Sequence, residues 1–277
     1  MRRSTTVRAA ILFVLLSLTT AIADSAQNDA GTGADASNSS SAPTAVALGT
    51  TYTGRAGEWD LDWYQAPAAS SAPMCVELDA SQARSTGSEF DLATADGVRS
   101  VRYVVGPHGG ADFAGGLAGR GVTSATFGTT SFNDAQSYSF VLSPYTPQSA
   151  AVVNPGSTLS TAAPVSSPCF GGAFTLGQLA STENYNLGQF AAGTVLVVTT
   201  AATSPTGLQV SLLDAAGNVV ATSSGGGIMT TQAPTTGTYY VSATRSTSAL
   251  DQIQYIVGVV SGGDPGSPCR PTCLLSH

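Results

Sequence analysis

The sequence contains no lysine and few charged side chains of any kind. Its 10 basic residues are all arginine, they face 17 acidic residues, and charged residues make up only 10% of the chain. An acidic surface without lysine repels phosphate backbones, which argues against nucleic acid as a partner. Serine, threonine, glycine and alanine dominate instead, and this composition favours hydroxyl-rich strands and loops over helices that carry salt bridges.

Histidine is almost absent, which limits the catalytic chemistry that the sequence supports. A serine hydrolase needs an imidazole to accept the serine proton, and only His108 and His277 are present. His108 lies in a turn-like stretch of glycine and proline at 106–110, and the sequence has no G-x-S-x-G motif. Paired carboxylates of a glycoside hydrolase stay open as an alternative, because folding could bring two acidic residues together. The sequence therefore favours a protein that is not an enzyme.

Long apolar runs are also missing after the first residues. Residues 1–23 combine a basic start, an apolar run at 9–18 and the small residues Ala21 and Ala23, which is the pattern of a signal peptide. The apolar run is shorter than the roughly 20 residues that span a bilayer. We therefore expect this segment to be cleaved, and the mature protein to be secreted or on the cell surface, with no stable membrane insertion.

The four cysteines of an exported chain are expected to form disulfides. A zinc site is disfavoured, because there is no C-x-x-C pair and no nearby histidine. Four cysteines allow three pairings. Cys269 and Cys273 could close a short loop, which would leave Cys75 to pair with Cys169 and join the two halves of the chain.

Short segments of β-branched and aromatic residues alternate with glycine, proline and Asp-Gly turns along the chain. The expected strands are 50–54, 59–65, 75–78, 98–105, 122–127 and 138–142, followed by 174–179, 185–190, 195–200, 208–213, 219–222, 228–231, 238–243 and 253–259. No window keeps a helical period over three turns. The pattern predicts an all-β protein with two tandem antiparallel β-sandwich domains of jelly-roll-like type.

Composition also predicts where these domains begin and end. An exposed, polar and acidic lead-in is expected at 24–46, the first sandwich at 47–146 and the second at 169–262. A stretch rich in proline, serine and alanine at 147–168 is the expected linker between them. The C-terminal tail, 263–277, carries the last two cysteines.

Three motifs of the second half resemble the bacterial pre-peptidase C-terminal domain. They are Tyr-Asn-Leu-Gly-Gln-Phe-Ala-Ala-Gly-Thr at 185–194, a hairpin at 208–218 that ends in Asp-x-x-Gly-Asn, and Gly-Thr-Tyr-Tyr-Val at 237–241. The first half resembles the same family at 28–35, 51–54 and 60–64, without an equivalent of the Gly-Thr-Tyr-Tyr strand. The resemblance implies β-sandwich modules of a kind often attached to exported peptidases, some of which bind calcium or polymeric substrates. Here we expect two divergent copies without a peptidase domain.

Acidic residues gather before and within the expected strand at 59–65. Asp29, Asp35, Glu58, Asp60 and Asp62 could supply the hard oxygen ligands that calcium prefers, although their spacing matches no EF-hand loop. Alternatively, Asp60 and Asp62 only face solvent. Calcium is the only cofactor that the sequence points to.

Aromatic residues of the same segment offer a second candidate site. Trp59, Trp63 and Tyr64 could stack on sugar rings, because aromatic faces provide broad apolar contact. The alternative is that they are core residues of a sandwich. Alternation puts Trp59 and Trp63 on one face of the strand, and Asp62 and Tyr64 on the other.

Taken together, these features predict a non-catalytic, extracellular binding or stabilising module. Its partner would be an extracellular protein, a glycan or an envelope surface. A secreted polysaccharide-active hydrolase and a purely structural envelope or matrix protein are the alternatives.

Overall fold

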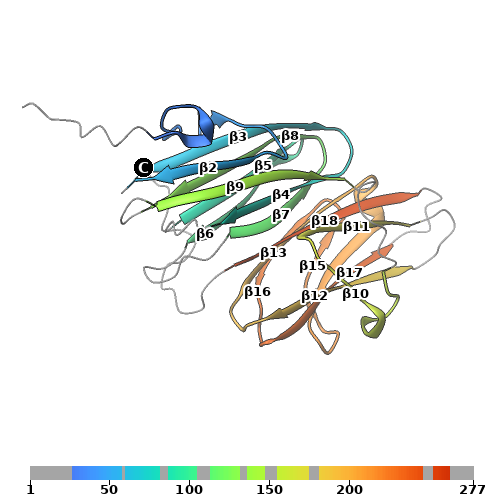
Figure 1. Cartoon of the computed structure of the whole chain (residues 1–277). Helices are drawn as coiled ribbons and strands as arrows, with labels where there is room; N and C mark the ends of the chain where they lie inside the picture. Colours follow the sequence, from blue (N-terminus) through green and yellow to red (C-terminus); the bar gives the residue numbers. More distant parts are fainter. Residues whose placement is uncertain are drawn as a thin grey trace, which may run out of the picture.

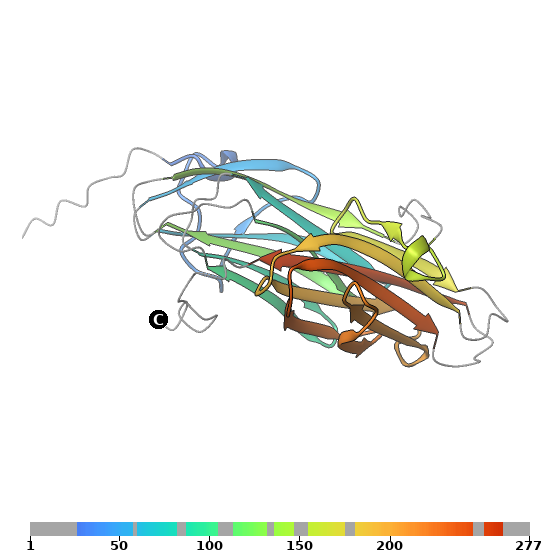
Figure 2. The same ribbon diagram turned by 90° about the horizontal axis from the view of Figure 1, so that it is seen from below.

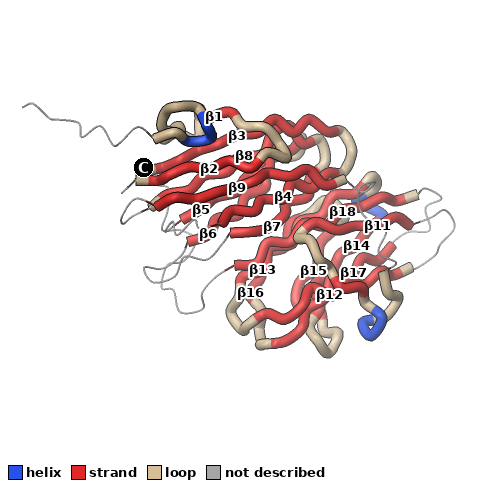
Figure 3. The backbone as a smooth tube through the Cα atoms, in the orientation of Figure 1, coloured by secondary structure: helices blue, strands red, loops and turns tan. Residues whose placement is uncertain are grey.

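The computed structural model describes residues 27–57, 60–81, 87–104, 113–131, 136–146, 155–174, 181–245 and 252–262. In this part of the chain, nearly all regular structure is strand (Figure 3). The exceptions are three single-turn 3-10 helices: η1 (Asp29–Gly31), η2 (Leu159–Thr161) and η3 (Pro205–Gly207). None of the described helices is long and apolar enough to cross a membrane. The all-β prediction is confirmed.

The first sandwich packs two sheets against each other (Figure 1). One sheet has the order β1 (Thr44–Ala45), β3 (Leu61–Ser70), β8 (Val122–Thr130), β5 (Gly87–Thr94) and β6 (Gly97–Val104). The facing strands are β2 (Thr51–Ala56), β9 (Gln136–Tyr145), β4 (Met74–Ser81) and β7 (Phe113–Gly119). Apolar side chains from both sheets, among them Phe90, Phe127 and Phe140, fill the space between them and are removed from water.

The second sandwich has its own core and the same arrangement. One sheet has the order β10 (Ala163–Pro164), β12 (Thr182–Phe190), β17 (Gly237–Arg245), β14 (Leu208–Leu213) and β15 (Val219–Ser224). The facing strands are β11 (Cys169–Phe174), β18 (Ile253–Gly262), β13 (Val195–Ala202) and β16 (Ile228–Gln232). Phe174, Leu212 and Tyr239 lie in this separate core.

The two sandwiches have identical topology. If the nine strands of each half are numbered from one, both outer sheets have the order 1-3-8-5-6 and both inner sheets the order 2-9-4-7. Each half also begins with a short strand that pairs in parallel with its third strand, while the other ladders are antiparallel. The structure therefore confirms two tandem β-sandwiches and shows that they are topological repeats.

Two segments that were expected outside the sandwiches are part of them. In the lead-in, Ala36 and Val46 are buried in the first core, and β1 extends the first outer sheet. In the expected linker, β10 pairs with β12, and Ala163 is buried. A few apolar residues of these polar stretches are therefore buried against the sandwiches. The predicted signal peptide, 1–23, and the predicted tail, 263–277, lie outside the described residues.

The inner sheets of the two sandwiches join into one. β7 pairs with β18 at Gly115 and Val260, which gives a continuous sheet with the order β16-β13-β18-β7-β4-β9-β2, and β11 also pairs with β18. Seen from below, the first sandwich lies at one end of the molecule and the second at the other (Figure 2). The junction between them is therefore built from backbone hydrogen bonds as well as side-chain packing.

Candidate functional site

Three of the five predicted calcium ligands lie together at one end of the first sandwich. Carboxylate oxygens of Asp29 in η1, Asp35 and Asp62 in β3 are all within 4.8 Å of one another. Asp60 is close enough for its charge to raise the pKa values of Asp35 and Asp62. The sequence prediction thus selected residues that the fold does bring together, while Glu58 lies outside the described residues.

A tight turn carries Asp29 to this position. Ala30 and Gly31 both have positive φ angles, 52° and 73°, a region that glycine adopts freely and alanine rarely. The Asp29 carboxylate accepts hydrogen bonds from the backbone N–H groups of Arg55 at 2.8 Å and Ala36 at 3.1 Å. Two backbone donors therefore hold this buried carboxylate between the turn and β2.

Asp62 is fully buried, contrary to the interpretation that it faces solvent. Its Oδ2 accepts a hydrogen bond of 2.7 Å from the hydroxyl of Tyr138 in β9, and the hydroxyls of Tyr138 and Tyr64 are 2.6 Å apart. The other oxygen, Oδ1, has no hydrogen-bond partner among the described residues. A buried carboxylate oxygen without a partner is costly, and such an oxygen is a free ligand for a cation.

The electrostatics of this acidic group favour protonation when no cation is present. Burial, with smaller contributions from Asp60, Asp29 and Asp35, raises the pKa of Asp62 to about 8, and the hydrogen bond from Tyr138 opposes this rise. Asp35 is exposed as a residue, but partial desolvation of its carboxyl group raises its pKa to about 6, and the charges of Asp60 and Asp29 add to this rise. Like charges that are brought together out of water therefore resist ionisation.

These pKa shifts predict that the calcium-free protein loses stability as the pH rises. Because the pKa of Asp62 is higher in the folded protein than in the unfolded chain, protonated Asp62 stabilises the folded state. This contribution to the free energy of unfolding is complete below pH 3.8, decreases as the pH rises, and is lost above about pH 8. Asp62→Asn should remove most of this dependence, on the order of a few kcal/mol, because the amide stays neutral. Urea unfolding in chelator at about pH 5 and about pH 9 measures the effect. An equal pH slope in the wild type and the variant would contradict it.

The second sandwich repeats the buried part of this arrangement. Glu183, Tyr185 and Tyr255 occupy the strand positions of Asp62, Tyr64 and Tyr138. Tyr255 donates a hydrogen bond to Glu183, and its hydroxyl lies 2.7 Å from that of Tyr185. Burial raises the pKa of Glu183. Residues 146–168, which lead into this repeat, contain no aspartate or glutamate, so the metal-ligand pattern is specific to the first sandwich.

A glycine makes room for the tyrosine hydroxyls in each repeat. A Cβ atom on Gly54 would lie 2.3 Å from the Tyr138 hydroxyl oxygen. On the equivalent Gly172, a Cβ would lie 3.0 Å from the hydroxyls of both Tyr185 and Tyr255. The sequence prediction missed these tyrosines and glycines. A signal was present, since both halves carry an acid-x-Tyr triplet, Asp-Trp-Tyr at 62–64 and Glu-Asn-Tyr at 183–185.

The predicted sugar-stacking residues are buried where the structure describes them. Tyr64 is fully buried, and Trp63 is 5% exposed. The ring of Trp63 lies over Gly128, where an added Cβ would be 2.5 Å from the ring. Only Tyr64 belongs to the hydrophobic core between the sheets, but both rings are too little exposed to stack on a sugar. Trp59 and His108 lie outside the described residues.

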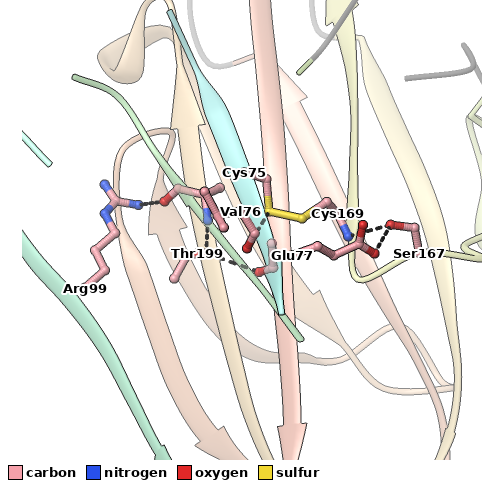
Figure 4. The surroundings of a disulfide bond; sticks show 9 residues. Cys75, Val76, Glu77, Arg99, Ser167, Cys169 and Thr199 are labelled. Carbon is pink, nitrogen blue, oxygen red and sulfur yellow. Dashed lines mark hydrogen bonds between the residues drawn. A yellow bond between two sulfur atoms is a disulfide. The ribbon is translucent and has the colours of Figure 1, made fainter. Parts of the chain in front are cut away.

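The disulfide between Cys75 and Cys169 is present, and it links β4 of the first sandwich to β11 of the second (Figure 4). Both cysteines are fully buried in a small cluster with Ala118, Ala201 and Ile256. Near it, the hydroxyl of Ser167 donates to the Glu77 carboxylate at 2.7 Å, a second contact between the halves. The predicted pair Cys269–Cys273 lies outside the described residues.

Neither a protein-family model nor a curated protein matches this sequence. Among solved structures, the chain is similar to PliG of Aeromonas hydrophila, a periplasmic inhibitor of g-type lysozyme. The identity is 17% and the TM-score 0.30, over 36% of this chain and 94% of that one.

It is also similar to the pre-peptidase C-terminal domain of a collagenase from Bacillus anthracis, with 15% identity and a TM-score of 0.25, over 37% of this chain and 93% of that one. Similarity at this level assigns the chain to neither protein's family.

Proposed function

We propose that this protein is a non-catalytic, extracellular binding module whose first sandwich is ordered by a calcium ion. The observation that carries this proposal is the convergence of Asp29, Asp35 and Asp62, with one buried oxygen of Asp62 left without a hydrogen-bond partner among the described residues. Calcium prefers carboxylate oxygens, and it would neutralise charges that otherwise repel one another. The three aspartates would hold it, with Asp60 adding negative charge nearby.

Calcium at this position would connect elements that are distant in sequence. Asp29 belongs to the N-terminal turn and is bonded to the backbone of β2, while Asp62 belongs to β3 and is bonded to Tyr138 of β9. An ion bound between them would fix the lead-in against both sheets of the first sandwich. Because calcium requires ionised carboxylates, its affinity should increase with pH as the protons on Asp62 and Asp35 are lost.

Calcium should therefore raise the melting temperature of the protein. For a dissociation constant near 10 μM, about 1 mM calcium adds roughly 2.7 kcal/mol, or about 5–10 °C for a chain of this size. Asp35→Asn should abolish most of the rise without disturbing the core, because Asp35 is exposed. Asp79→Asn, an exposed position on β4, is the matched control and should keep the full rise. The same melting temperature in calcium and in chelator would refute the calcium site.

The extracellular assignment is supported by the interdomain disulfide, since disulfides of this kind persist in oxidising compartments.

A relationship to pre-peptidase C-terminal domains, which we also propose, is supported by where the motifs fall: 185–194 begins in β12, 208–218 covers β14 and the following turn, and 237–241 opens β17. The partner would be an extracellular protein or glycan. Hydrolysis of an insoluble polysaccharide by the purified chain, lost in Asp62→Asn, would overturn the non-catalytic role.

A further inference from the structure

A cleft of about 470 Å³ lies between the two sandwiches, away from the acidic cluster. The first sandwich contributes three turns from the same end of its sheets: Ser71 after β3, Ala95 and Asp96 between β5 and β6, and Arg120 and Gly121 between β7 and β8. The second contributes Ala201 and Ala202 at the end of β13, Pro205 of η3 and Gly226 between β15 and β16. Turns gathered at the end of a sandwich and clefts between domains are common places for ligand sites.

The back of the cleft is held rigidly by Arg99. Its guanidinium group donates to the backbone carbonyl of Ala118 in the first sandwich, and to those of Thr200, at 2.8 Å, and Gly226, at 2.7 Å, in the second. The side chain is only 8% exposed. Close by, the amide of Ala118 donates to the hydroxyl of Thr199 at 2.7 Å, a further bond across the junction (Figure 4). The two walls are therefore fixed relative to each other without a ligand.

The charges in the cleft leave one positive group without a counterpart. Asp96 forms an ion pair with Arg99 at 3.6 Å and accepts a hydrogen bond from Thr94. Both interactions lower the pKa of Asp96, and the hydrogen bond from Thr94 has the larger effect. Arg120 is exposed, and neither ion pair found among the described residues includes it. In an acidic chain, this is a local excess of one positive charge, which favours an anion.

The lining combines that charge with small apolar groups and hydrogen-bonding oxygens. Alanine, proline and glycine form smooth walls that can contact the C–H face of a sugar ring. The carboxylate of Asp96, whose side chain is 65% exposed, and the hydroxyl of Ser71 can bind sugar hydroxyls. Arginine binds carboxylates through two parallel hydrogen bonds, which Arg120 is free to offer.

We propose that this cleft binds a uronic acid residue of an acidic glycan, with its carboxylate on Arg120 and its hydroxyls on Asp96 and Ser71. Other ligand classes fit less well. A phosphate monoester carries almost twice the charge of a uronate carboxylate, so the exposed carboxylate of Asp96 would repel it more strongly. An amino acid would place its ammonium group against Asp96, whose charge Arg99 already balances in part, whereas a sugar hydroxyl needs only an acceptor oxygen there. The proposal uses no residue of the acidic cluster, and it rests on the proposed function only in taking the protein to be a binding module.

Isothermal titration with trigalacturonic acid and with its methyl ester tests the charge requirement. The acid should bind at least about tenfold more tightly than the ester, because esterification removes the charge but keeps the rings. Arg120→Gln should weaken binding of the acid by about the same factor, whereas Arg102→Gln, an exposed arginine of β6 outside the cleft, should change it less than about twofold. Equal binding of acid and ester, or equal loss in both variants, would overturn the proposal.

Filling the cleft is an independent test that keeps every charge. Ala95→Phe places a ring at the exposed β5–β6 turn and should also weaken binding of the acid by about tenfold. Each titration is run in calcium and in chelator, because oligogalacturonates bind calcium themselves. If calcium raises the melting temperature but trigalacturonic acid does not bind in either buffer, the cleft assignment fails while the calcium-ordered module stands. Binding that persists unchanged in Ala95→Phe also contradicts the assignment.

Discussion

Arg99→Met is expected to lower the free energy of unfolding by about 3–5 kcal/mol. The wild-type guanidinium group donates to three backbone carbonyls, on Ala118, Thr200 and Gly226, and two of them belong to the other sandwich. Methionine keeps much of the side-chain volume but donates no hydrogen bond, so these carbonyls lose a charged donor at the junction. Denaturation of the disulfide-intact chain by guanidinium chloride measures the loss.

The matched control for this experiment is Arg120→Met. Arg120 lines the same cleft, but it is exposed and no hydrogen bond to it is found among the described residues, so the change should stay within about 0.5 kcal/mol. The shape of the unfolding curve carries further information. If Arg99 couples the two sandwiches, its loss should broaden one transition or divide it into two. A variant as stable and as cooperative as the control would show that the junction does not depend on Arg99.

Two of the strands that sequence patterns failed to predict explain why the junction was not visible beforehand. β7, Phe-Ala-Gly-Gly-Leu-Ala-Gly, and β11, Cys-Phe-Gly-Gly-Ala-Phe, contain too much glycine to resemble strands, since glycine is depleted in strand interiors. At the junction, glycine is required. A Cβ on Gly116 would lie 2.5 Å from the sulfur of Cys169, and one on Gly258 would lie 2.5 Å from the carbonyl oxygen of Gly116. These positions require glycine because two backbones approach each other closely there. That approach is a property of the tertiary structure, so local sequence patterns do not reveal it.

The acidic site also shows that local sequence does not reveal contacts between distant strands. Local sequence was sufficient to select Asp29, Asp35, Asp60 and Asp62, because the first two lie in an opening rich in glycine and aspartate and the other two alternate at the start of an expected strand. Alternation also placed Asp62 and Tyr64 on one face of the strand correctly. It could not show that this face is the core, since the partner that makes burial of Asp62 tolerable, Tyr138, lies 76 residues away. Burial of Asp62 therefore depends on a hydrogen bond from a distant strand, which alternation along one strand does not reveal.

Removal of the Cys75–Cys169 disulfide should be about as damaging as loss of Arg99. The two cysteines are 94 residues apart, and for a closed loop of this length the chain-entropy model gives roughly 4–5 kcal/mol. Cys75→Ala combined with Cys169→Ala should therefore lower the free energy of unfolding by about 3–5 kcal/mol, with the small cavity in the cluster of Ala118, Ala201 and Ile256 adding to the loss.

The control is the double change Cys269→Ala and Cys273→Ala, which should cost much less, because a disulfide between these two cysteines, as predicted from the sequence, would close a loop of only a few residues. Both junction cysteines are fully buried, so a thiol reductant can reach them only when the junction opens. Their reduction should therefore be slow in buffer and accelerate steeply in Arg99→Met, where opening is easier. Equal reduction rates in the wild type and Arg99→Met would mean that the disulfide is reached by a local fluctuation, and that Arg99 does not hold the two sandwiches closed over it.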